Sequence, residues 1–91
     1  MEHLNKQVGP LLQNLQAQMA TQAPLLQARV NNILAQRSQD INEIDHLMDD
    51  LFPVLEYGYC VEDFHRLNAY LATLDAEVAE FYTEQFKEWM K

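Results

Sequence analysis

The fold is indicated most clearly by residues 60–81, which read CVEDFHRLNAYLATLDAEVAEF. The apolar residues of this stretch recur at alternating steps of four and three positions: Cys60, Phe64, Leu67, Leu71, Leu74, Val78 and Phe81. Such spacing places them on one side of an α-helix, in a heptad-like seam about three heptads long. Glu62 and Asp63 stand in the expected first turn, where the positive end of the helix dipole attracts acids. The pattern therefore predicts one helix over residues 61–90.

A second apolar line precedes this seam and predicts helical structure over residues 10–51. Its residues are Leu11, Leu15, Met19, Leu26, Val30, Ile33, Ile41, Ile44, Met48 and Leu51, and the steps are three and four once Gln22 and Arg37 are counted at the two missing points. Pro10 marks the start, because proline suits the first helical position, and residues 1–9 are expected to fray. The line keeps its phase across Pro24, and two interpretations stay open: a break that makes a hairpin at residues 21–24, or one long helix kinked there.

The connector between the two helical stretches is predicted at residues 52–60. Pro53 disfavours helical geometry in the residue before it, so the first stretch is expected to end near Phe52. Gly58 is free to take the left-handed conformation that ends a short helical turn. These residues therefore separate the chain into two helical arms.

Together these elements predict an all-α protein with a single domain over residues 1–91, folded as a long antiparallel helical hairpin or a three-helix bundle. Only two glycines and three prolines are present, which disfavours a fold of many short strands. A helix of residues 61–90 would be about 45 Å long, whereas residues 10–22 would cover only about 20 Å of it and a continuous helix over residues 10–51 would span about 63 Å. Because the lengths do not match in either case, we expect a second copy to complete a larger bundle as a homodimer.

Charge is divided unevenly along the chain, whose formal net charge is −8. Residues 1–39 carry a net charge of +2 and residues 40–91 a net charge of −10, and all nine aromatic residues lie in the second part. This acidity argues against direct binding to nucleic acid or to anionic membranes, since both reward clustered Lys and Arg. No apolar stretch approaches the length of a membrane-spanning helix, and no secretion signal is recognised at the start. Cys60 is the single cysteine, so no internal disulfide is expected and a cytoplasmic location fits best.

Two Glu-x-x-His pairs, Glu43 with His46 and Glu62 with His65, give the sharpest chemical signal. Di-iron helical bundles use such pairs, with both side chains pointing into the bundle. If the apolar line faces inward, however, His46 points about 180° away from it and Glu43 about 120° away, and the second pair is also turned outward. Solvated polar faces are therefore the preferred interpretation, with no metal and no cofactor, and a metal carboxylate bundle is kept as an alternative.

No reaction is indicated by the sequence. Its serine, histidine and carboxylate residues form no recognisable triad, and no glycine-rich loop is present to hold phosphate. Cys60 has acidic neighbours that disfavour its thiolate, so it is interpreted as a small core residue. The chain is therefore predicted not to be an enzyme.

The C-terminal part offers a candidate surface for binding another protein. Aromatic residues widen the apolar face toward the C-terminus, and a line of glutamates at helical spacing runs beside it. The candidate contact residues are Tyr70, Glu77, Glu80, Phe81, Tyr82, Glu84, Phe86 and Trp89, with Glu88 extending the line of acids. Carboxylates at steps of three and four repel one another mildly, which favours a basic partner, although a solvated face is the simpler interpretation.

The leading hypothesis is a protein-binding helical module, such as an adaptor, a chaperone or an inhibitor, that buries a helical face against its partner. A first alternative is an acidic mimic of nucleic acid that inhibits a DNA- or RNA-binding enzyme, which the charge of residues 40–91 motivates. The metal carboxylate bundle is a second alternative. A third is an oligomerisation scaffold without a distinct client.

Overall fold

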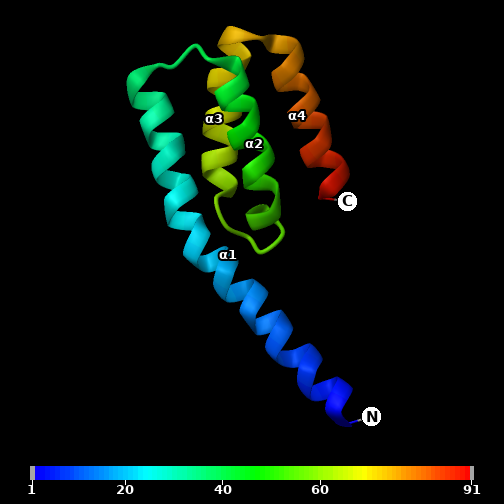
Figure 1. Ribbon diagram of the computed structural model, residues 1–91. Coiled ribbons are helices and arrows are strands. Elements are labelled where there is room, and N and C mark those ends of the chain that lie inside the picture. The colour runs from blue at the N-terminus through cyan, green and yellow to red at the C-terminus, as the bar shows by residue number, and fades with distance from the viewer. Residues whose placement is uncertain (1, 91) are drawn as a thin grey trace.

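The computed structural model contains four helices joined by short connections (Figure 1). It describes the backbone of residues 2–90 and the side chains of residues 15–90. The helices are α1 (Glu2–Gln36), α2 (Ile41–Leu55), α3 (Val61–Leu74) and α4 (Ala76–Trp89). No strand occurs among residues 2–90, so the prediction of an all-helical chain is confirmed.

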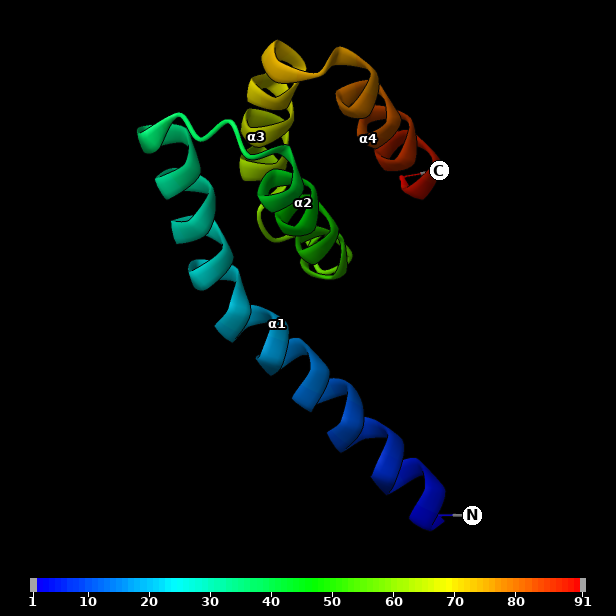
Figure 2. The same cartoon turned by 45° about the horizontal axis from the view of Figure 1, so that its top comes forward.

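Helices α2 and α3 run antiparallel and form the centre of the bundle (Figures 1 and 2). Helix α1 packs along one side of this pair, and α4 packs against α3 from the other side. The 35 residues of α1 correspond to about 52 Å, close to the 53 Å long axis of the molecule. The first half of α1 therefore extends beyond the bundle. Because α1 is helical from Glu2, the expectations that residues 1–9 fray and that the helix starts at Pro10 are wrong.

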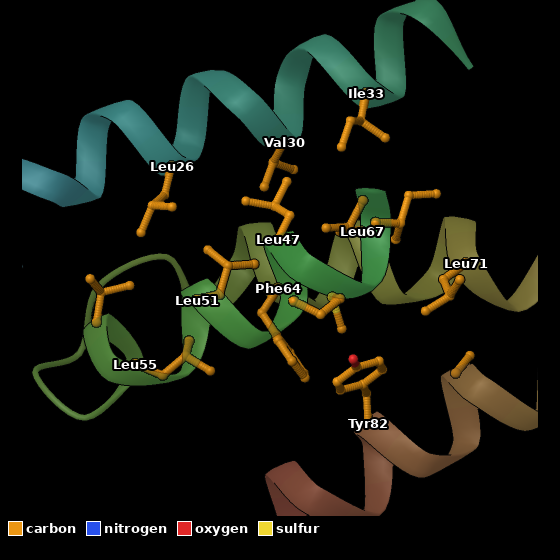
Figure 3. Packing of buried hydrophobic residues seen from close by; sticks show 14 residues of the cluster. Leu26, Val30, Ile33, Leu47, Leu51, Leu55, Phe64, Leu67, Leu71 and Tyr82 are labelled. Atoms are coloured by element: carbon orange, nitrogen blue, oxygen red, sulfur yellow. The ribbon is translucent and has the colours of Figure 1, made fainter. Parts of the chain in front are cut away.

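One hydrophobic core joins all four helices (Figure 3). Helix α1 contributes Leu26, Val30 and Ile33 from one side, and α4 contributes Tyr82 from the other. Helix α2 lies between them and is buried on more than one side, so it supplies the largest share of the core. The remaining core residues are Ile44, Leu47, Met48, Leu51, Val54, Leu55, Phe64, Leu67, Leu71 and Ala79. Burial of their apolar surface is the main force that stabilises this arrangement.

Helix α1 ends with a Schellman C-cap. Arg37 takes the left-handed conformation (φ 51°), and the Ser38 N–H donates to the Ile33 carbonyl at 3.2 Å. The pairing satisfies a carbonyl that has no partner inside the helix. The chain therefore leaves the helix at this point and turns toward α2.

Helix α2 begins at an N-cap supplied by Asp40, whose side chain accepts a hydrogen bond from the Glu43 N–H at 3.2 Å. Such a cap typically stabilises a helix by about 1 kcal/mol. The helical path is thus broken at residues 37–40. The prediction of one helical stretch over residues 10–51, interrupted only near Pro24, is wrong in this respect.

Helix α1 continues through Pro24, so the hairpin interpretation of residues 21–24 is wrong. A proline inside a helix removes one hydrogen bond and costs about 3 kcal/mol. Ala23 and Leu26, on either side of Pro24, are both buried against the bundle. Their packing offsets this cost, and the interpretation of one long helix holds across the proline.

Helix α2 also continues through a proline, Pro53, and so extends into the predicted connector at residues 52–60. The helix ends at Leu55, and Gly58 in the turn that follows has the left-handed conformation that was predicted for it (φ 82°). The Tyr59 N–H donates to the Val54 carbonyl at 3.1 Å and completes a second Schellman motif. The connector is therefore shorter and tighter than expected.

The last helical stretch is divided at Asp75, which corrects the prediction of one helix over residues 61–90. Asp75 is extended (φ −153°, ψ 98°), and its side chain accepts a hydrogen bond from the Val78 N–H at 3.2 Å. It also ends α3, because its own N–H donates to the Leu71 carbonyl at 2.8 Å. One residue therefore caps two helices, and α4 folds back against α3.

Gly58→Ala is expected to lower the free energy of unfolding by about 1 kcal/mol. A Cβ at this position would meet open space, so the cost comes from the left-handed backbone (φ 82°) alone. Gly58→Asn is the matched control and should cost less, because asparagine tolerates this conformation better. Urea unfolding followed by circular dichroism measures both variants. Equal destabilisation by the two, or none by alanine, would contradict this cap.

Candidate protein-binding surface

Helix α4 has an inner face that packs on the bundle and an outer face that points to solvent. The inner face carries buried Ala79 and Tyr82 together with half-buried Phe86 and Trp89. The exposed residues on the opposite side, called the α4 outer face from here on, are Glu77, Glu80, Phe81, Glu84 and Glu88. They fall within about 100° of the helix circumference. The predicted line of acids therefore forms one continuous surface with an aromatic residue in it.

Phe81 lies at one edge of the α4 outer face, about midway along its length. Its side chain is 56% exposed, and its ring lies edge-on to Tyr82 with 5.3 Å between ring centroids. Lys87 approaches the Glu84 carboxylate at 3.5 Å. Both partners of that ion pair are well exposed, so the pair is screened by water and neutralises little of the local charge. The surface thus combines an exposed aromatic ring with a line of carboxylates beside it.

Tyr82 fixes the orientation of α4 by reaching into the core, where it is 2% exposed. Its O–H donates to the Asp45 carboxylate. The Asp45 carbonyl oxygen and the Asp49 carboxylate lie 3.2 and 3.4 Å from the same hydroxyl oxygen. Burial, and then the hydrogen bond to Asp45 and the two negative charges, raise the pKa of the Tyr82 phenol well above its usual range. The phenol therefore stays protonated and keeps α4 turned with Phe81 outward.

Aromatic rings fill the space between α4 and the α2–α3 pair. Phe64 stacks on Phe86 with 5.1 Å between ring centroids, and it contacts Phe52 edge-on at 5.4 Å. His65 lies edge-on to Phe86 at 4.8 Å, and Trp89 extends the cluster at 6.1 Å from Phe86. Aromatic pairs of this kind add about 0.5–1.5 kcal/mol beyond the burial of their area. The C-terminal turns of α4 are therefore held to the bundle by packing.

The structure divides the predicted contact residues into two groups. Those that lie on the α4 outer face are Glu77, Glu80, Phe81 and Glu84. Tyr82, Phe86 and Trp89 pack inward, and Tyr70 is half-buried with its O–H donating to the Ser38 carbonyl at 2.8 Å. These last four residues belong mainly to the packing of the bundle and do not form an open surface. Sequence reasoning grouped all eight because it assumed an unbroken helix.

The four residues of the metal alternative lie on exposed helix surfaces. Glu43 and His46 lie near the start of α2, and Glu62 and His65 lie near the start of α3. Because α2 and α3 are antiparallel, these starts are at opposite ends of the pair (Figure 1). Among residues 15–90, no group of three or more His, Cys, Asp or Glu side chains is placed to hold a metal ion. The two Glu-x-x-His pairs therefore do not meet within one copy of the chain.

Cys60 lies just before α3 with its thiol turned toward α1. Its Sγ donates to the Ala23 carbonyl at 3.5 Å, and the residue is half-buried. Burial, and secondly the carboxylate of Asp63, raise the pKa of the Cys60 thiol. Since a protonated thiol is a poor nucleophile, the surroundings favour packing over chemistry at this position.

A shallow groove between α1 and α2 has no signal in the sequence, because it arises only when these helices pack together. Its volume is about 430 Å³, and it is lined by Gln22, Leu25, Leu26, Arg29, Asp49, Asp50 and Pro53. The Arg29 guanidinium lies 3.0 Å from the Asp50 carboxylate across it. Both of these side chains are about half exposed, so the ion pair contributes at most about 1 kcal/mol to stability.

Comparisons with known proteins find no match to this chain among family models, curated proteins or solved structures. Within the part of the chain that the structure describes, no helix has both the length and the apolar character needed to cross a membrane. The functional inference therefore rests on the surfaces of the bundle, and the α4 outer face is the one with the clearest chemical character.

Tyr82→Phe is expected to lower the free energy of unfolding by about 1.5 kcal/mol at neutral pH, because it removes a hydrogen bond to a carboxylate and keeps the ring. The folded-state pKa of Tyr82 is raised above its unfolded value, which is about 10. Its stabilising contribution is therefore present below about pH 10 and is lost as the pH rises above that value. Urea unfolding across this range should show a steeper loss for the wild type than for the variant, and parallel curves would contradict the assignment.

Proposed function

We propose that this chain is a non-enzymatic protein-binding module that uses the α4 outer face to bind a basic helical segment of another protein. The observation that supports this proposal is the 56% exposure of Phe81 among four glutamates on a helix whose other side is anchored in the core. Adaptors, chaperones and inhibitors all act through such burial of a helical face.

Apolar contact and charge supply different parts of the proposed interaction. Covering Phe81 removes an exposed aromatic ring from water, and aromatic anchors of this kind often provide much of the affinity at an interface. The glutamates attract Lys and Arg residues and set the orientation of the partner. A basic amphipathic helix fits both requirements, because its apolar stripe is flanked by cationic residues at the same helical spacing.

The anchoring of α4 favours binding for a further reason. Tyr82, next to Phe81 in the helix, is buried and hydrogen-bonded, and the aromatic cluster holds the end of the helix. The outer face is therefore already ordered before a partner arrives, and little conformational entropy is lost at this surface on binding.

The test is affinity capture, from cells that express the protein naturally, with three baits compared side by side. The baits are the wild type, Phe81→Ser and the matched control Leu25→Ser, which alters a similarly exposed leucine on α1. The wild type and the Leu25 variant should recover the same partner, and the Phe81 variant should lose it. Loss with the Leu25 variant and retention with the Phe81 variant would contradict the proposed surface.

A further inference from the structure

The apolar seam seen in the sequence continues in register across the corner at Asp75. The seam consists of two sets of residues that each repeat every seven positions. The first set is Phe64, Leu71 and Val78, and the second set is Cys60, Leu67, Leu74 and Phe81. The corner contains neither glycine nor proline, the residues that usually interrupt a helix. A single extended residue joins α3 to α4. The same sequence is therefore also compatible with one continuous helix.

Helix α4 carries two apolar lines, and the second one ends at an exposed residue. The inner line, spaced by three and four residues, is Ala79, Tyr82, Phe86 and Trp89, and it holds α4 to the bundle. The other line continues the α3 seam through Val78 and ends at Phe81, whose side chain is 56% exposed. In the folded-back arrangement the last position of the seam therefore has most of its surface in water.

Straightening of the chain at Asp75 would move α4 away from the surface of α2 and α3 on which it packs, called the α4 seat from here on. Tyr82 and Ala79 would leave the core, and the ring of Phe64 would lose its stacking partner Phe86. This loss of buried area is unfavourable for a single molecule. A second copy of the chain, however, offers an identical α4 that fits the vacated seat with the same contacts.

We propose that α4 exchanges between two copies of this chain, with α3 and α4 of each copy joined into one helix from Val61 to Trp89. That helix would be about 43 Å long. Each α4 then occupies the seat on the other copy, where the Tyr82 O–H donates to Asp45 of that second copy. The straightened corners lie beside each other at the two-fold axis. This inference stands apart from the proposed function, since it depends on the corner and the inner line.

Two opposing effects set the balance between the closed monomer and the exchanged dimer. The closed form keeps the Asp75 cap on the Val78 N–H and needs no second molecule. The exchanged form gains helical hydrogen bonds at the corner, and mass action favours it at high protein concentration. Each copy has a formal charge of −8, so salt should promote the dimer by screening the repulsion between copies.

Two substitutions at the corner shift this balance in opposite directions. Asp75→Ala removes the cap and favours helix, so it should lower the dimer dissociation constant by about 30-fold over two copies. Ala76→Pro suits the first position of α4 but breaks a continuous helix, so it should raise that constant by more than about 100-fold. Asp40→Ala removes a comparable cap at α2 and should leave the constant unchanged. Sedimentation equilibrium measures all three variants against the wild type.

Two results in this series would overturn the proposal. One is an Ala76→Pro variant that dimerises as strongly as the wild type, since a continuous helix is then not required. The other is a wild type and an Asp75→Ala variant that both remain monomeric up to about 1 mM, because the exchanged form is then not reached even without the cap.

A distance measurement separates exchange from simple contact between closed copies. Spin labels at Glu62→Cys and Gln85→Cys, on a Cys60→Ser background, report on the two ends of the α3–α4 pair by pulsed electron paramagnetic resonance. Labelled protein is diluted with unlabelled protein so that only distances within one chain are seen. The dimer should show about 35 Å between the labelled positions, the length of the straight helix between them. A dimer that keeps the shorter distance of the closed monomer would overturn the exchange.

Discussion

Leu51→Ala is expected to lower the free energy of unfolding by about 3 kcal/mol. Leu51 is completely buried in the core, where α2 lies between the other helices (Figure 3). Removal of its terminal carbons loses hydrophobic burial and leaves a cavity that close-packed neighbours fill only in part. A domain of this size is typically stable by about 5–10 kcal/mol, so the variant should lose a large fraction of its stability. Urea unfolding followed by circular dichroism gives the value.

The matched control is Leu25→Ala, which makes the same chemical change at a position 64% exposed on α1. Its effect should remain below about 1 kcal/mol, because a solvent-exposed leucine contributes little burial. If the two leucine variants were equally destabilised, the placement of α2 at the centre of the core would be wrong.

Tyr82→Ala is expected to lower the free energy of unfolding by about 3–5 kcal/mol, because it removes a buried aromatic ring together with the hydrogen bonds to Asp45. Tyr82 is the largest side chain that α4 places fully in the core. Its loss should release α4 before the rest of the bundle. Native-state hydrogen exchange should therefore show a selective loss of protection in residues 76–89.

Phe81→Ala provides the control for this prediction within the same helix. The ring of Phe81 is adjacent in sequence and similar in size, but it is 56% exposed. Its removal should cost less than about 1 kcal/mol and leave the protection of α4 intact. A larger effect for Phe81 than for Tyr82 would mean that α4 is turned the other way on the bundle.

The apolar periodicity of the sequence located much of the core. The buried positions that it predicted correctly include Leu26, Val30, Ile33, Ile44, Met48, Leu51, Phe64, Leu67 and Leu71. Leu47 was missed because α2 is buried on more than one side, whereas a single stripe assumes one neighbour. Val54 and Leu55 were missed because the helix was expected to end near Phe52. Burial of a central helix depends on how other helices surround it, and this arrangement is not encoded in its own spacing.

The helix boundaries were predicted less well, because two aspartate N-caps were overlooked. Asp40 precedes Glu43 by three residues, and this spacing resembles a capping box. Asp75 is followed two residues later by Glu77, and acidic residues are common in the first turn of a helix. In both places the apolar line continued in phase across the break, so periodicity alone favoured a continuous helix. Periodicity reports on which side of a helix is apolar and does not detect where a cap ends it.

Proline led to errors in the opposite direction. Pro53 was expected to end a helix and Pro24 either to break or to kink one, but both lie within helices. Each has core residues close by in the same helix, Leu26 beside Pro24 and Val54 beside Pro53, and their burial outweighs the lost hydrogen bond. The acidic line on α4 could be predicted from its spacing, whereas the exposure of Phe81 within that line depends on the corner at Asp75.

The measurement that tests the central claim most directly is an amide NMR titration of the isotope-labelled protein with a synthetic amphipathic helix whose leucine stripe is flanked by lysines. Several acidic clusters compete for this peptide in one molecule, including the exposed Asp49 and Asp50 on α2. If the α4 outer face is the binding surface, chemical-shift changes should concentrate on residues 77–88, and the Phe81→Ser variant should lose them. Shift changes that spread evenly over all acidic surfaces, or that persist unchanged in Phe81→Ser, would show that charge alone attracts the peptide and would contradict the account.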